Sequence, residues 1–240
     1  MTGHGGGGPV IPDFGEASDC VTENRLFCPD WVRDNWGDVL QPAVVQHMKL
    51  TGIAVAAGFA IAFAAAVVAH RYRKVEGPFS LFSAVVYTIP SIALFQLLVP
   101  ITGLGVLTVE VALVGYTLLI LFRNVLEGLR ATPPDVLEAA LGMGLTRRQT
   151  LWRIELPLAL PAIVAGLRVA TVSTIALATI AAVVIPEGLG RPIFIALRAY
   201  FKTEFIAAGV LAIVLALAAD LVLVGVQRLL TPWTYARRVA

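Results

Sequence analysis

The chain has 240 residues, of which 58% are hydrophobic and 14% are charged, and its formal net charge is +2. Soluble domains contain about 45–50% apolar and about 25% charged residues, so this composition excludes an ordinary soluble protein and predicts a membrane protein. The small net charge gives no reason to expect a nucleic-acid partner, whereas long apolar runs predict contact with membrane lipid.

Residues 1–45 are predicted to form a tail that precedes the first membrane span. The tail opens with a Gly-rich leader, residues 1–9, which has the composition of a flexible segment. Residues 30–48 contain Trp31 and Trp36 among apolar residues, and we interpret them as an interfacial helix because tryptophan favours the headgroup layer. An extension of the first spanning helix after Pro42 is the alternative.

Five apolar runs are close to the roughly 20 residues that an α-helix needs to cross a bilayer. They are residues 50–70, 79–99, 105–122, 157–184 and 205–228. A short uncharged turn joins the second and third runs, which predicts a tight helical hairpin, and Pro90 and Pro161 predict kinks inside their runs. The sequence therefore predicts an all-α integral membrane protein with five spans, a transmembrane domain at residues 46–232 and a C-terminal tail at 233–240.

Lysine and arginine gather on one side of this five-span topology. One cluster follows the first span, a second lies between the third and fourth spans, and a third closes the chain: Arg71, Arg73 and Lys74; Arg123, Arg130, Arg147, Arg148 and Arg153; Arg228, Arg237 and Arg238. Because positive charge in short loops marks the cytoplasmic side, we expect the N-terminus outside and the C-terminus inside.

The two cysteines, Cys20 and Cys28, both lie in the tail that is expected outside. An oxidising compartment favours a disulfide between them, which would close a small loop. Two unpaired thiols in the tail are the alternative.

The predicted cytoplasmic loop, residues 123–156, contains signals for two short helices. Thr132-Pro133-Pro134-Asp135 supplies a capping residue, a proline for the first turn and an acid, so a helix is expected to start there. Gly142 and Gly144 are expected to end it, and Thr146 with Gln149 forms a capping box that starts the next helix. The prediction is a pair of helices joined by a glycine turn and exposed to the cytoplasm.

This loop resembles the EAA loop of binding-protein-dependent importer permeases, because it has the spacing EAA-x3-G-x9-I-x-L-P. In that family the loop is the coupling helix, which seats in a cleft of a separate ATPase subunit. The resemblance therefore implies an ATPase-coupling site, whereas a helical hairpin on the bilayer surface is the alternative. The candidate coupling residues are Glu138, Ala139, Ala140, Gly144, Arg147, Arg148, Ile154, Leu156 and Pro157.

Residues 45–232 as a whole are similar to permeases of the choline, glycine betaine and carnitine osmoprotectant importers. The similarity is carried by residues 88–94, 138–146, 155–161 and 165–168, while the tail and the turn at 185–190 depart from the family pattern. It implies a multi-pass subunit of the bacterial inner membrane that forms half of the pathway for such a solute. It also implies three partners: cytoplasmic ATPase subunits, a second permease, identical or paralogous, and an external solute-binding protein.

Two other functions stay open from the sequence alone. An amino-acid or methionine importer permease has the same five-helix plan, and an ATP-independent channel or secondary carrier is a different class. The chain has no phosphate-binding loop of the Gly-x-x-x-x-Gly-Lys type, so we expect ATP and Mg²⁺ on the partner ATPase, no enzyme activity and no cofactor in this chain. His4, His47 and His70 are isolated in the sequence and predict no metal site.

Polar residues inside the spans are costly to bury, so each needs a partner or a wet cavity and is a candidate for the transport pathway. The alternatives are a hydrogen bond to a neighbouring helix and, for Glu110, a carboxylate at the membrane interface. Arg168 and Asp220 are expected at similar depth and are a candidate ion pair, although a pore-facing Arg168 or separate solvation of the two are alternatives. The full set of candidates is Ser91, Gln96, Glu110, Arg168, Thr171 and Asp220.

Overall fold

The structure is a computed structural model that describes residues 19–232 and is helical throughout that range. The Gly-rich leader and the C-terminal tail at 233–240 lie outside the described residues. The elements are α1 (Asp19–Thr22), α2 (Pro29–Asp34), the π-helical turn η1 (Trp36–Leu40), α3 (Gln41–Arg71), α4 (Arg73–Thr88), α5 (Ser91–Thr102), α6 (Val106–Arg130), α7 (Pro134–Gly142), α8 (Arg147–Thr150), the π-helical turn η2 (Leu151–Glu155), α9 (Leu156–Ala181), α10 (Gly190–Ala199) and α11 (Lys202–Leu230).

Four of the described helices are long and apolar enough to cross a membrane, and α4 with α5 makes a fifth span if the bent pair is counted as one. The four are Trp36–Arg71, Val106–Arg130, Arg147–Ala181 and Lys202–Leu230. An all-helical chain with four to five candidate spans is therefore confirmed.

The second predicted span, residues 79–99, is wrong as a single helix. The chain breaks at Ile89 and Pro90, and α4 and α5 meet there at 105°. Proline disfavours the helical conformation of the residue before it, and Ile89 is extended accordingly, with φ −66° and ψ 130°. The Tyr116 hydroxyl of α6 donates a hydrogen bond to the Ile89 carbonyl oxygen at 2.5 Å, which satisfies a backbone acceptor released by the break.

The first spanning helix starts earlier than predicted. From Trp36 the chain runs through η1 into α3 without interruption to Arg71, so residues 36–48 continue directly into the first spanning helix, which begins before Pro42. The interfacial position expected for residues 30–48 stays a prediction. Only the short helix α2 remains separate. Leu40, the last residue of the π-helical turn, is fully buried with Ala207 and Ala208 of α11.

The spans pack through small residues, as expected for helices that associate in lipid. Alanines of α3, at positions 54, 62, 66 and 69, are almost completely buried against α6. A Cβ on Gly58 would lie 1.8 Å from the Thr117 hydroxyl oxygen, and one on Gly166 would lie 2.5 Å from the Asn124 Cβ. These close approaches fix α3, α6 and α9 as the central three helices of the bundle.

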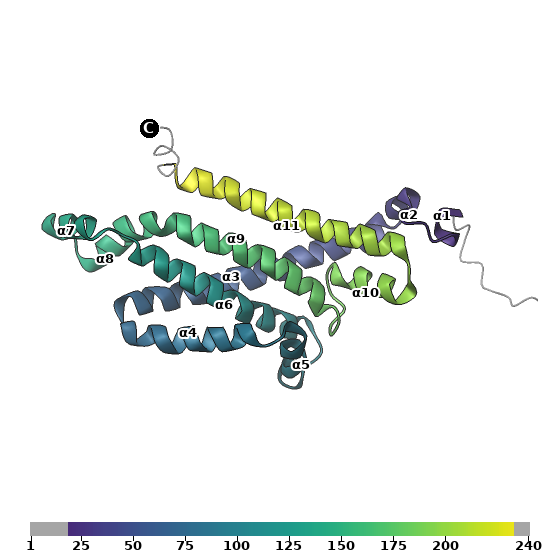
Figure 1. The fold of residues 1–240 in the computed structure, drawn as a ribbon, viewed down its shortest axis with the longest axis horizontal. Coiled ribbons are helices and arrows are strands. Elements are labelled where there is room, and N and C mark those ends of the chain that lie inside the picture. Colours follow the sequence, from purple (N-terminus) through teal and green to yellow (C-terminus); the bar gives the residue numbers. More distant parts are fainter. Residues whose placement is uncertain (1–18, 233–240) are drawn as a thin grey trace, which may run out of the picture.

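The two ends of the bundle carry different elements (Figure 1). At one end lie α7 and α8, together with the turn from α3 to α4 and the last turns of α11. At the opposite end lie α1, α2 and α10. The three predicted arginine clusters, as far as residue 232, are thus found at the end that carries α7.

Candidate functional site

The predicted coupling loop projects from the end of the bundle as the short helix α7 (Figure 1). Its first residue is Pro134 and its N-cap is Pro133, so the prediction that Thr132 caps this helix is wrong. The Thr132 hydroxyl is instead buried and has no hydrogen-bond partner within residues 19–232. Glu138 and Ala139 are exposed on α7, whereas Ala140 is fully buried.

The turn after α7 depends on one glycine. Gly142 is the last helical residue, and Gly144 takes the left-handed conformation with φ +78°. The Gly144 N–H donates to the Leu141 carbonyl oxygen at 2.9 Å, and the Leu145 N–H donates to the Ala140 carbonyl oxygen at 3.1 Å. A left-handed residue that closes such bonds is the usual end of a helix at glycine.

The predicted capping box after the turn is present, but the helix that it starts is not short. The Thr146 N–H donates to Gln149 Oε1 at 2.8 Å, and the Gln149 N–H donates to Thr146 Oγ1 at 3.4 Å. From Arg147 the chain is helical through α8 and η2 to Ala181, so this segment is the beginning of the fourth span. The loop of 123–156 is corrected at both ends, because residues 123–130 belong to α6 and Ile154, Leu156 and Pro157 lie in the long helix.

A cavity of 410 Å³ lies between α7, the end of α3, α8 and η2, and it is lined by Leu137, Leu141, Arg147 and Glu155 among others. At its edge, His70 Nε2 of α3 lies 3.1 Å from the buried Glu155 carboxylate. No local sequence pattern links His70 with a residue 85 positions away. This contact joins the end of α3 to η2, the segment that follows α8.

A second cross-link at the same end was also missed by sequence reasoning. The Arg130 guanidinium donates two hydrogen bonds to the Glu76 carboxylate, at 2.9 and 2.6 Å, and so joins the end of α6 to the start of α4. Bidentate pairs of this kind fix orientation as well as distance.

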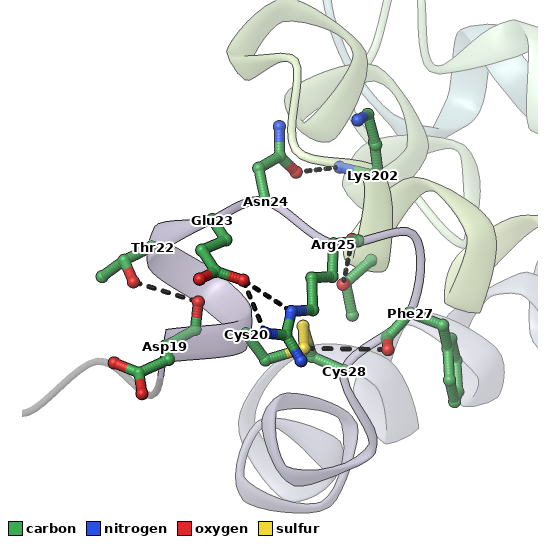
Figure 2. The surroundings of a disulfide bond; sticks show 10 residues. Asp19, Cys20, Thr22, Glu23, Asn24, Arg25, Phe27, Cys28 and Lys202 are labelled. Carbon is green, nitrogen blue, oxygen red and sulfur yellow. Dashed lines mark hydrogen bonds and ion pairs between the residues drawn. A yellow bond between two sulfur atoms is a disulfide. The ribbon is translucent and has the colours of Figure 1, made fainter.

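At the opposite end of the bundle, Cys20 and Cys28 are joined by a disulfide (Figure 2). The loop that it closes is attached to the corner between α10 and α11 through Asn24. The Asn24 amide donates to the Tyr200 carbonyl oxygen at 2.7 Å and accepts from the Lys202 N–H at 3.0 Å. The tail is therefore a bound part of this face of the protein from residue 19 onward.

The turn at 185–190, which departs from the family pattern, is held by α3. Gln46 Oε1 accepts from the Gly188 N–H at 2.9 Å, and His47 Nδ1 accepts from the Leu189 N–H at 3.2 Å. Since Nδ1 is an acceptor, Nε2 carries the proton and donates to the Ile175 carbonyl oxygen at 3.0 Å. His47 is fully buried. It is thus a structural bridge between three segments, which its isolation in the sequence did not reveal.

Arg168 and Asp220 form a bidentate ion pair between α9 and α11, with distances of 2.8 and 2.9 Å. Each side chain is about one third exposed, and both line a cavity of 520 Å³. The structure therefore has the ion pair, and not a pore-facing Arg168 alone or separate solvation of the two residues. The pair joins two charged residues that are 52 positions apart in the sequence and lie on different helices.

The remaining candidates are dispersed. Both carboxylate oxygens of Glu110 are buried and have no hydrogen-bond partner within residues 19–232, and the side chain lines a cavity of 780 Å³ with Lys49. Thr171 donates to the Leu167 carbonyl oxygen of its own helix at 2.7 Å. Gln96 is exposed on α5, and Ser91 lines a cavity at the break between α4 and α5.

The described residues contain no group of three or more His, Cys, Asp or Glu side chains that would hold a metal ion. His4, one of the three histidines, lies outside the described residues.

Comparisons with known proteins agree on one family. The model of the family described as "Binding-protein-dependent transport system inner membrane component" matches residues 43–234. The choline transport system permease protein OpuBB of Bacillus subtilis is 34% identical over 202 residues, which cover 84% of this chain and 93% of that protein. The glycine betaine/carnitine/choline transport system permease protein OpuCB of Bacillus subtilis is 33% identical with the same coverage. The osmoprotectant import permease protein OsmW of Salmonella typhimurium is 34% identical and covers 84% of this chain and 96% of that protein.

Solved structures show the same fold. Inward-facing structures of the MetNI methionine ABC transporter contain a chain with a TM-score of 0.69 to this one. The sequence identity is 20% in one crystal form, where the match covers 80% of this chain and 96% of that chain. In a second crystal form the identity is 22%, and the match covers 90% and 100%. At this identity the likeness establishes the fold alone.

Proposed function

This chain belongs to the family of binding-protein-dependent transport system inner membrane components, and on that premise we propose that it imports a quaternary-ammonium osmoprotectant such as choline, glycine betaine or carnitine. The observation that carries the substrate class is the agreement of three relatives, each about one third identical over more than four fifths of this chain, whose names all give solutes of this class or osmoprotectants. It is a permease subunit of the inner membrane, with several helices that are able to span it.

The chain works within a larger assembly of three further components: a second permease, identical or paralogous, separate ATPase subunits that bind ATP and Mg²⁺, and an external binding protein that selects the solute. Four to five spans are too few to enclose a pathway alone. The exposed apolar side chains of α11, among them Ile213, Leu217, Leu221 and Val222, meet lipid or the second permease. This chain binds no cofactor of its own.

The end of the bundle with α7 faces the cytoplasm, and the disulfide-closed loop faces outward. The support is the distribution of charge, since Arg71, Arg73, Lys74 and the arginines of the loop gather at the α7 end. An outward position also suits a disulfide, because the bacterial cytoplasm keeps thiols reduced.

α7 is the part that receives the motion of the ATPase. It stands beyond the ends of the spans and exposes Glu138, an acceptor for a basic partner, beside the small Ala139. Displacement of α7 is transmitted through the Gly144 turn to the continuous helix Arg147–Ala181, which is long and apolar enough to cross the membrane. The His70–Glu155 contact passes the same displacement to α3.

The candidate pathway residues differ in their support. Ser91 lines the cavity at the break between α4 and α5, and the Arg168–Asp220 pair lines a second cavity. Ser173 lines both cavities, so they are neighbours. We assign these three candidates to the pathway. Glu110, Gln96 and Thr171 line neither of these two cavities, and the Thr171 hydroxyl donates to a carbonyl oxygen of its own helix.

The proposal is tested by reconstituting the permease with its ATPase and binding protein in liposomes. Uptake of choline, glycine betaine or carnitine that requires both ATP and the binding protein is expected. Uptake without ATP would establish a channel or carrier instead, and uptake of methionine alone would establish an amino-acid permease. Glu138→Ala should abolish both uptake and solute-stimulated ATP hydrolysis, because an unpaired partner at a buried interface costs on the order of 1–3 kcal/mol.

A further inference from the structure

The break between α4 and α5 opens onto a cavity of 450 Å³ that lies between α4, α6 and α9. This volume falls within the roughly 300–1,000 Å³ of small-molecule sites. Tyr116, which lines it, is near the middle of α6 (Val106–Arg130), a helix long and apolar enough to cross a membrane, so the cavity lies midway along a candidate span. Irregular backbone at this depth is tolerated where it lines a cavity.

Two aromatic rings form a corner of the cavity. The ring centroids of Tyr87 and Tyr116 are 6.1 Å apart, and the ring planes meet at 71°. Tyr116 is held in place by its hydroxyl, which donates to the Ile89 carbonyl oxygen. Tyr87 is 44% exposed, so part of its ring is open to a ligand. Rings set nearly at right angles are able to contact one cation from two sides.

The polar lining matches a ligand whose cation donates no hydrogen bonds. The hydroxyls of Thr88, Thr117 and Thr174 all donate to carbonyl oxygens of their own helices, and no lysine, arginine, aspartate or glutamate lines the cavity. A primary ammonium group would need a set of acceptors or a carboxylate here, whereas a quaternary ammonium group needs only aromatic faces.

Two hydroxyls remain for an anionic group. Ser91, at the first position of α5, and Ser173 of α9 both line the cavity. Neither side-chain hydroxyl makes a hydrogen bond within residues 19–232. Both are able to donate to a carboxylate. The lining therefore combines a place for a quaternary cation with donors for the opposite end of a short zwitterion.

We propose that this cavity is an intramembrane binding site for the quaternary ammonium group of the transported solute, with Tyr87 and Tyr116 as its two aromatic walls and Ser91 and Ser173 as donors to a carboxylate. The site rests on the proposed function, and it adds a second point of solute recognition to that of the binding protein.

A thiol in the cavity makes binding measurable without the binding protein. The two native cysteines are joined to each other, so Ala176→Cys, at a position that lines the cavity but holds no proposed ligand group, introduces one reactive thiol into this chain. The permease–ATPase complex is placed in vesicles of phosphatidylethanolamine and phosphatidylglycerol, which carry no choline headgroup that would compete. Alkylation is then followed with glycine betaine and with 3,3-dimethylbutyrate, which has the same shape but a neutral carbon in place of the ammonium nitrogen.

Glycine betaine should slow alkylation of the cysteine at position 176, and 3,3-dimethylbutyrate should not. The control Ile180→Cys, on an exposed part of α9 outside the cavity, should show no protection. Tyr87→Phe keeps a ring and should retain protection, whereas Tyr87→Leu should weaken apparent binding roughly tenfold, which is about 1.4 kcal/mol.

Equal protection by both compounds would overturn the aromatic recognition, because shape alone would then explain it. No protection by glycine betaine, in vesicles that import it when the binding protein is added, would overturn the site and leave the proposed function standing. Protection in a system that imports no quaternary compound would refute the proposed substrate class, and it would also overturn the assignment of this cavity to the transported solute.

Discussion

Replacing Gly144 tests whether the turn after α7 transmits the motion of the ATPase. No atom lies within 4 Å of where its Cβ would be, so a side chain meets no steric obstacle. The cost comes from the backbone alone, since φ is +78° and a residue with a Cβ pays about 1–2 kcal/mol in the left-handed region. That free energy lowers the population of the native turn by about 5- to 30-fold.

Gly142 provides a matched control two residues earlier. It also has open space around its Cβ position, but it is a helical residue without positive φ. Gly142→Ala should therefore be neutral or slightly stabilising, because alanine favours a helix over glycine by roughly 0.8–1.0 kcal/mol. Comparing the two alanine variants separates the backbone conformation of the turn from the mere presence of a methyl group.

The measurements are the affinity of the detergent-solubilised permease for its ATPase and solute-stimulated ATP hydrolysis in proteoliposomes. Gly144→Ala should weaken affinity by about 5- to 30-fold if the whole strain opposes docking. Gly144→Val should be worse, because a β-branched residue in this region is a pronounced outlier, and Gly144→Asn should recover part of the loss. If Gly144→Ala and Gly142→Ala bind the ATPase equally well, the reasoning is refuted.

Three further predictions concern orientation, the tail and the intramembrane ion pair. A cysteine in place of Lys74 should react with an impermeant maleimide only from the cytoplasmic side, and a cysteine in the tail only from outside; the reverse pattern would invert the topology. Mass spectrometry of non-reduced peptides should find Cys20 linked to Cys28, with uptake preserved when both are serine, whereas complete alkylation without reductant would contradict the link. Asp220→Asn leaves the Arg168 guanidinium without its carboxylate and should lower the Tm by about 2–4 °C for each kcal/mol lost. Exchanging the two charges should recover part of that loss, and an unchanged Tm in the single variant would mean that the pair does not stabilise the bundle.

The membrane class and the loop could be predicted from sequence because both depend on local information. Apolar runs identify helices in lipid because a span must satisfy its own backbone hydrogen bonds. The helix break at Gly144 and the capping box at Thr146 also involve residues within five positions of each other. The family resemblance rests on the same short spacing.

Residues that act across the bundle were not predictable in this way. His47 seemed isolated, yet it is fully buried and bonds a turn about 140 residues away, and His70 meets Glu155 across 85 positions. Nothing in the sequence near either histidine identifies its partner. The same holds for Asn24, whose amide binds the corner at Tyr200 and Lys202.

Local patterns in the sequence are therefore sufficient for the all-helical class, the charged end of the bundle and the turn chemistry of the loop. The division of a span at Pro90 into two helices at 105° depends on packing, because a proline in a membrane helix either kinks it slightly or breaks it. The outcome depends on whether a neighbour satisfies the released backbone groups, and here the Tyr116 hydroxyl of α6 does so. Long-range packing also placed Arg168 beside Asp220, since pairing depends on the relative rotation of two helices and not on the spacing within either one.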